Sequence, residues 1–278
     1  MSKNFKPTIS NHRKELIKLL EKAAHSSTTL NVFNDFITVS ALSISNSSDS
    51  YYIANSKEVW NQREKRYLDT INKYDKNTRS LFPQMFAELV EELQEAATSH
   101  YTDVLGEIFS EMGFHDKRRN QFFTPQHISD LMAMMTIDSD TSAKTIEERG
   151  FITVNEPCCG AGSLLIGAIN AMLKLNLNPS KQMLIVANDI DELCVLMCYI
   201  QLSLYGIPAV VIRQNTITGE SFGHPWFSPV FIFDGWSCRV NHLFHKTSDS
   251  EKTDLAQIVL ESLTTDEEKP VTGQLSLF

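Results

Sequence analysis

One stretch constrains the fold more than any other: FITVNEPCCGAGSLL at positions 151–165. An apolar run ends on an acidic residue and a proline, a loop of small residues follows, and the chain then enters a helical pattern. Open α/β sheets bring backbone close to a ligand in this way, because glycine allows tight turns and leaves space that a side chain would fill. The sequence therefore predicts an α/β fold with a ligand loop at Gly160 and Gly162.

This loop differs from two common nucleotide-binding loops. No Lys-Ser or Lys-Thr pair follows the second glycine, as a Walker phosphate loop requires, and the three-glycine dinucleotide pattern is absent. Taken alone, the Gly-x-Gly turn is equally compatible with an ordinary strand-to-helix turn. The flanking segments are needed to choose between these interpretations.

Two further segments flank the loop at suitable distances. Upstream, RRNQFFTPQHISDLMAMM at 118–135 opens an amphipathic helical pattern with QFFTP. Downstream, the apolar run MLIVAN leads into Asp189, Ile190 and Asp191. A carboxylate at the end of such a strand can accept hydrogen bonds from ribose hydroxyls, so the pattern favours a nucleoside ligand.

In this order and spacing, QFFTP, NEPCCGAG and ANDID resemble the N6-adenine DNA methyltransferases of the type I modification-subunit kind, over roughly positions 105–236. The resemblance implies an α/β, Rossmann-like methyltransferase domain in a truncated form, with S-adenosylmethionine as cofactor. It also implies adenine N6 in DNA as methyl acceptor, a restriction-modification context and a separate specificity subunit as partner.

The resemblance assigns the methionine end of the cofactor to two segments. Phe123, Thr124 and Pro125 would form the motif that contacts this end. Glu156, which Pro157 follows, would bind the amino group of the cofactor.

The remaining cofactor contacts are implied in the same way. Gly160 and Gly162 would let the backbone pass close to the sulfonium, Asp189 would hold the ribose hydroxyls, and Ile190 would pack on the adenine ring. Asn215 stands where the family usually has an acidic residue that faces the cofactor adenine. For Asp189, the alternative is a solvated carboxylate at a strand end.

The chain departs from the family at the loop that holds the flipped target base. The Asn/Asp-Pro-Pro-aromatic tetrapeptide of the family does not occur in it. HPWF at 224–227 keeps one proline and an aromatic residue, whereas Asp234, Gly235 and Trp236 follow SPVFIF, whose pattern indicates a buried strand. Because ligands bind at the carboxyl ends of strands, position favours Asp234 to Trp236 as the catalytic loop. The alternative is an ordinary turn with a packing tryptophan.

The last residues contain a second motif. TTDEEKPVTG, acidic and with proline and glycine, is typical of a flexible tether and leads into QLSLF. QLSLF resembles the peptide by which bacterial polymerases and repair proteins bind the replicative sliding clamp, and the implied contacts are Gln274, Leu275, Leu277 and Phe278. Such a tether would raise the local concentration of a weak DNA binder. The alternative is that these side chains fold back on the surface of the chain itself.

Charge argues against DNA binding through phosphates alone. The net charge is −9, from 25 Lys and Arg against 34 Asp and Glu. Two local basic clusters, Lys117 to Arg119 and Arg63 to Arg66, are compatible either with phosphate contacts or with solvated helix surfaces. DNA contact is therefore expected to need a partner.

The five cysteines predict neither a disulfide framework nor a metal site. The pairs Cys158–Cys159 and Cys194–Cys198 are interpreted as buried thiols. Cys238, His242 and His245 have the spacing of part of a zinc site, but a fourth ligand is missing nearby.

The apolar stretch at 194–212 predicts a helix followed by a buried strand, because Gln201, Gly206 and Pro208 interrupt it. No cleavable signal pattern opens the chain, so a cytoplasmic protein is expected.

Three regions are expected along the chain. Residues 1–104 are predicted to be helical, with a loop or break at the serine-rich segment 40–56. Residues 105–245 form the methyltransferase-like domain, and 246–278 form the flexible acidic tail. Two functional hypotheses remain open: an adenine methyltransferase, or a catalytically inactive relative that acts as a clamp- or DNA-associated binding factor.

Overall fold

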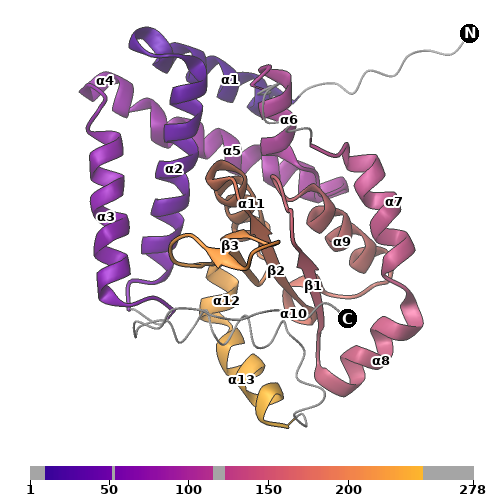
Figure 1. The fold of residues 1–278 in the computed structure, drawn as a ribbon. Coiled ribbons are helices and arrows are strands. Elements are labelled where there is room, and N and C mark those ends of the chain that lie inside the picture. The colour runs from indigo at the N-terminus through magenta and orange to yellow at the C-terminus, as the bar shows by residue number, and fades with distance from the viewer. Residues whose placement is uncertain (1–9, 52–53, 115–122, 247–278) are drawn as a thin grey trace, which may run out of the picture.

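The computed structural model describes residues 10–51, 54–114 and 123–246. In this part of the chain a mostly parallel, five-stranded sheet lies among helices, which confirms the prediction of an α/β fold (Figure 1). The strands are β1 (Ile152–Glu156), β2 (Met183–Asp189), β3 (Ala209–Asn215), β4 (Glu220–Ser221) and β5 (Trp226–Phe227).

Strands β1, β2 and β3 are parallel and adjacent in that order, with Ile152 opposite Met183 and Ile185 opposite Ala209. The short strands β4 and β5 both pair with β3 in the antiparallel direction. Strand β1 forms one edge of the sheet, and within the described residues nothing pairs with its other side. The carboxyl ends of the three parallel strands therefore share one edge, which we call the carboxyl edge.

The central strand is buried on both faces, as its uninterrupted apolar sequence predicts for a parallel strand covered by helices. Met183, Ile185 and Ala187 belong to the larger hydrophobic core, whereas Leu184 and Val186 belong to a smaller one on the opposite face. Alternate side chains of a strand point to opposite faces, so β2 contributes to both cores.

Two crossover helices cover the face with the larger core, and two short helices cover the other face. The crossover helices are α9 (Ser163–Lys174) and α11 (Glu192–Leu204), and the two short helices are α12 (Pro229–Phe233) and α13 (Trp236–Lys246). A further single turn, α10 (Pro179–Gln182), precedes β2. The predicted helix and buried strand at 194–212 are α11 and β3, so this prediction is confirmed.

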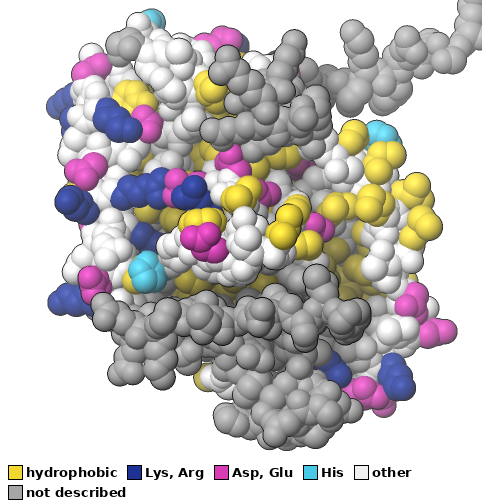
Figure 2. All heavy atoms as spheres, viewed as in Figure 1, with side chains coloured by type: hydrophobic (Ala, Val, Ile, Leu, Met, Phe, Trp, Pro, Cys, Tyr) yellow, Lys and Arg dark blue, Asp and Glu magenta, His cyan; other side chains and the backbone are white. Residues whose placement is uncertain are grey.

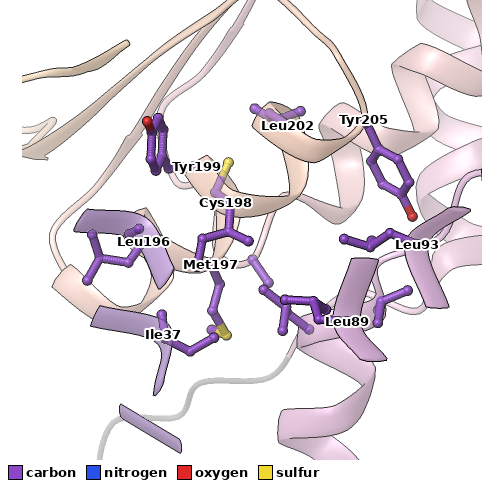
Figure 3. Packing of buried hydrophobic residues seen from close by; sticks show 14 of the residues in the cluster. Ile37, Leu89, Leu93, Leu196, Met197, Cys198, Tyr199, Leu202 and Tyr205 are labelled. Atoms are coloured by element: carbon purple, nitrogen blue, oxygen red, sulfur yellow. The ribbon is translucent and has the colours of Figure 1, made fainter. Parts of the chain in front are cut away.

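The described residues before β1 are mostly helical, and many of them share the larger core with the sheet. In Figure 3, Ile37 from this region lies beside Met197 of α11, and Leu93 lies on the side of Tyr205. The helices are α1 (Asn11–Ala23), the 3-10 turn η1 (Ala24–Ser26), α2 (Thr29–Ser48), α3 (Lys57–Ile71), α4 (Lys76–Arg79), α5 (Leu81–Ser99), α6 (Val104–Glu111), α7 (Gln126–Thr136) and α8 (Ser139–Arg149). Among the helices described, none has the length and apolar character needed to cross a membrane.

The prediction of a loop across the serine-rich segment 40–56 is wrong for its first half, because α2 continues to Ser48. The serines are accommodated inside the fold: Ser45 accepts a hydrogen bond from Arg63, and the hydroxyl of Ser48 donates to the carbonyl of Ile44. Tertiary packing and these local hydrogen bonds override the weak helix propensity of serine. The break in the helix begins at Asp49.

The prediction of a buried strand at 228–233 is also wrong, since the segment forms helix α12. A short apolar run has no periodicity that separates a buried strand from a buried helix. The deciding signal is Ser228 followed by Pro229: the serine hydroxyl caps the helix by accepting from Phe231, and proline is favoured in the first turn.

Candidate functional site

Two carboxylates lie at the ends of adjacent strands. Glu156 ends β1 opposite Ala187, and Asp189 ends β2. Asp189 accepts the backbone N–H of Gly160 at 2.9 Å through Oδ2 and that of Asp191 at 2.9 Å through Oδ1. Burial raises the pKa of both Glu156 and Asp189. The carboxyl edge thus presents two partly desolvated acidic groups beside the glycine loop.

The loop between them needs glycine at two positions. Gly160 has φ +53° and Gly162 has φ +106°, in the left-handed region that side chains disfavour. A Cβ atom on Gly160 would lie 3.2 Å from the ring of Phe123, and one on Gly162 would lie 3.2 Å from Sγ of Cys198. Neighbouring side chains therefore fill the space that the two glycines leave.

The segment Phe123 to Pro125 packs directly on this loop, although nearly forty residues separate them in sequence. The ring of Phe123 faces Gly160 and also packs on Phe109, with 5.4 Å between ring centroids. The hydroxyl of Ser163, the first residue of α9, donates to the carbonyl of Thr124 at 2.8 Å. Pro125 then caps α7. The structure brings together the first two segments of the sequence pattern.

The third segment, which contains Asp189 and Ile190, lies at the same edge. Ile190 is 56% exposed and follows Asp189 directly, and Nε of Arg213 donates to its carbonyl at 3.2 Å. The hydroxyl of Thr216 donates to the carbonyl of Pro157 at 2.6 Å, which joins the loops after β3 and β1. An exposed apolar side chain beside a half-buried carboxylate suits a ligand that has both a flat apolar part and hydroxyl groups.

Asn215 lies at the end of β3, at the same edge, but its side chain is already engaged. Oδ1 accepts the backbone N–H groups of Ile217 at 3.1 Å and Thr218 at 3.3 Å. The side chain therefore holds the turn that follows β3, as asparagine often does.

An open cavity of about 450 Å³ runs along the free side of β1 and includes Glu156. Met132 and Ala133 of α7 and Ile137 lie on its apolar side, and Thr141 of α8 is among its polar residues. Figure 2 shows hydrophobic side chains gathered over α7, on the right of the view. The exposed apolar residues of this helix are Ile128, Leu131, Met132, Met134 and Met135.

The residues predicted to be catalytic, Asp234, Gly235 and Trp236, are not brought to this edge. Asp234 forms an ion pair with Lys181, which precedes β2, so it lies near the amino ends of the parallel strands. Trp236 is fully buried and packs on Phe151 with 5.0 Å between ring centroids. The physical reason is that β5 runs antiparallel to β3 and returns the chain to the amino ends.

The alternative loop, His224 to Phe227, lies nearer the carboxyl edge, but its aromatic rings are buried. Trp226 is 7% exposed and packs between Tyr199, at 5.2 Å, and the guanidinium of Arg63, at 4.1 Å. Its faces are therefore occupied by the protein itself.

Within the basic cluster Arg63 to Arg66, Lys65 is exposed and Arg66 is half-buried, whereas Arg63 is buried. Arg63 is 7% exposed and donates to Oγ of Ser45 at 2.7 Å and to the carbonyl of Pro225 at 2.8 Å, and burial lowers its pKa to about 10. Arg66 pairs with Glu192 at 2.7 Å. Arg63 thus ties the helical region to the hairpin after β3. The cluster Lys117 to Arg119 and the clamp-like residues 274–278 lie outside the described residues.

Among the cysteines, Cys159, Cys194 and Cys198 are buried as expected, whereas the prediction is wrong for Cys158, which is exposed at the start of the glycine loop. Over the described residues, no group of three His, Cys, Asp or Glu side chains is placed to hold a metal ion.

Sequence reasoning missed three residues that donate hydrogen bonds to the glycine loop or to the segment packed on it. Ser163 donates to the carbonyl of Thr124, Thr216 donates to that of Pro157, and Gln201 of α11 donates to the carbonyl of Ala161 at 2.8 Å. The available signal was the single amide in the apolar run of α11, which indicates a buried polar contact.

No curated protein matches the chain, but a family model agrees with this arrangement. The family model described as N-6 DNA Methylase matches residues 101–253, which is more than half of the chain and includes every segment of the carboxyl edge. The chain therefore belongs to the N-6 DNA Methylase family.

Proposed function

We propose that the chain binds S-adenosylmethionine in a Rossmann-like arrangement at the carboxyl edge and methylates adenine N6 in DNA. The observation that supports this most strongly is the convergence of three distant segments, Phe123 to Pro125, Glu156 to Gly162, and Asp189 to Ile190. Each segment contributes a group that suits one part of this cofactor.

The residues present fit the cofactor chemically. Each carboxylate oxygen of Asp189 already accepts one backbone N–H, and its remaining lone pairs can accept from ribose hydroxyls. Ile190 offers an exposed apolar surface for the adenine ring. Glu156 accepts from the N–H of Cys158 through Oε1 at 3.2 Å and can pair with a cationic amino group through Oε2.

When bound, the cofactor supplies a methyl group on a positively charged sulfonium. The glycine loop would lie beside that centre, in a backbone conformation that depends on positive φ at Gly160 and Gly162. Transfer would form the bond from N6 to the methyl group as the bond from sulfur to the methyl group breaks, and the amine would lose one proton to solvent, so in-line positioning of the amine would be the main contribution of the protein. We propose that DNA and a separate specificity subunit assist in holding the base.

Cofactor binding is tested by calorimetric titration of the full-length protein with S-adenosylmethionine. Saturable binding is expected for the wild type and its loss for Asp189→Ala. Asp191→Ala is the matched control, because that carboxylate caps α11 by accepting from Leu193 and Cys194, whereas the N–H of Gly160 in the loop donates to Asp189. Binding that survives in Asp189→Ala, or is absent from the folded wild type, would contradict the proposal.

Methyl transfer is tested separately, with labelled cofactor and duplex DNA that contains adenine, with and without a specificity subunit. Labelled N6-methyladenine is the expected product. Cofactor binding without any transfer in either condition would count against the enzyme and support the second function.

The second function is a non-catalytic clamp- or DNA-associated factor that keeps the cofactor fold. Two observations favour it: Asp234 and Trp236 lie near the amino ends of the strands, and Trp226 and Phe227 are buried. Under this proposal QLSLF recruits the chain to the sliding clamp. Deletion of Gln274 to Phe278 should abolish binding to purified clamp in a pull-down while cofactor binding is unchanged. Equal clamp binding with and without these residues would refute the recruitment.

A further inference from the structure

Gln201 is an amide side chain buried within the apolar helix α11. It is 0% exposed, and its neighbours Ile200 and Leu202 belong to the larger core. A buried primary amide is costly unless its donors and its acceptor are all bonded. The contacts of Gln201 therefore show what the residue does.

Three hydrogen bonds fix the orientation of this amide. Nε2 donates to the carbonyl of Ala161 at 2.8 Å and to Oδ1 of Asp103 at 2.8 Å, and Oε1 accepts from the N–H of Leu105 at 3.1 Å. The carbonyl is an acceptor only and the backbone N–H is a donor only, so the reverse orientation would leave both unpaired.

The contact with Ala161 reaches the centre of the glycine loop. Ala161 lies between Gly160 and Gly162, and the peptide that follows it is held on both sides. Gln201 binds its carbonyl, and its N–H, on Gly162, donates to the carbonyl of Cys159 at 2.9 Å. A turn with two glycines is otherwise free to adopt many conformations.

The contact with Asp103 reaches a different part of the molecule. Asp103 caps α6 by accepting from the N–H of Gly106 at 2.9 Å, and its own N–H donates to Gln126 at the start of α7. One side chain thus connects the glycine loop with the first turns of α6 and α7.

We infer that Gln201 is a positioning residue, which holds the Ala161–Gly162 peptide in its ligand-binding orientation and couples it to the cap of α6. The inference rests on the proposed function, because the ligand of the loop is taken to be S-adenosylmethionine.

The test compares two variants of the full-length protein. Gln201→Met keeps the length of the side chain but removes its hydrogen bonds. Asn170→Leu is the control, because Asn170 is equally buried and binds Tyr101 and Asp130 without touching the loop. Two readouts are used: amide hydrogen exchange of residues 159–163 without cofactor, and the Kd for S-adenosylmethionine.

Gln201→Met should speed exchange in the loop and raise the Kd, each by about tenfold, as expected when a buried hydrogen bond is lost and its partner is left unpaired. Asn170→Leu should leave both within about twofold, because its lost bonds lie elsewhere. Unchanged loop exchange in folded Gln201→Met would overturn the inference, and so would an equal effect of Asn170→Leu.

The two proposals fail in different ways. Absence of cofactor binding by the wild type would refute the proposed function, while loop exchange in the variants would still test Gln201. If Gln201→Met does not fold, the side-chain amide protons of Gln201 are followed by NMR in the wild type. They should exchange slowly with solvent, and fast exchange would contradict the inference.

Discussion

The two ends of the same sheet behave differently. At the carboxyl edge, Glu156 and Asp189 lie on adjacent parallel strands and share the glycine loop. Near the amino ends, Asp234 and Trp236 contact Lys181 and Phe151, far along the strands from that loop. In a β-α unit the crossover fixes the direction of the strand, so the sequence alone shows at which end of the sheet a motif after that strand lies. A segment that follows a hairpin has no such constraint on its direction.

The largest expected difference is between two glycines, one near each end of the sheet. Gly162→Ala should lower the free energy of unfolding by about 2 to 4 kcal/mol and abolish cofactor binding, because φ is +106° and the new Cβ would contact Cys198. Gly235→Ala, at φ +64° with open space around it, should cost only about 1 kcal/mol and keep binding. Urea denaturation and calorimetry measure both, and equal effects would break the comparison.

An intermediate effect is expected at Asp103, behind the carboxyl edge. Burial raises its pKa to about 6. A raised pKa means that the folded state binds the proton more tightly, so this contribution to stability is greatest below the ordinary pKa of aspartate and is lost as the pH rises through 6. At neutral pH the buried charge therefore destabilises the fold.

Asp103→Asn removes this charge and keeps an oxygen for Gly106 and Gln201, which both donate to Oδ1. It should raise the free energy of unfolding by about 1 to 3 kcal/mol at pH 8 and have little effect at pH 4. Denaturation of the wild type and of Asp103→Asn between these two pH values measures the difference in their free energies of unfolding. A difference that does not change with pH would contradict the burial argument.

The smallest effect is expected at Asp234. Its ion pair with Lys181 is partly exposed, so Asp234→Ala should cost less than about 1 kcal/mol and leave cofactor affinity unchanged. A double-mutant cycle with Lys181→Ala measures the pair directly. If Asp234→Ala instead abolished methyl transfer while stability was preserved, the prediction that this residue is catalytic would be supported.

The position of the segments at the carboxyl edge could be predicted from sequence because each one combines a direction with a chemical group. The run MLIVAN is long and apolar enough to predict a buried parallel strand, and the carboxylate that follows it must lie at its carboxyl end. The two glycines likewise predict a turn that needs positive φ, which the structure has at both positions.

The remainder could not be predicted because it depends on tertiary context. The apolar run VFIF has no periodicity that separates a strand from a helix, so only the Ser228–Pro229 pair before it indicates a helix, and the reversal of direction at β5 depends on its pairing with Val210 and Val211. The burial of Arg63 could not be predicted either, because its partners Ser45 and Pro225 come from distant segments. The short helix and the hairpin decide where Asp234 lies, and both are set by packing.

Hydrogen–deuterium exchange of the full-length protein with and without S-adenosylmethionine tests the central claim most directly, because it compares both ends of the sheet in one experiment. The account predicts slower exchange at residues 123–125, 156–162 and 189–191 on addition of cofactor, and no change at 234–236. Protection at 234–236 with an unchanged glycine loop would contradict it.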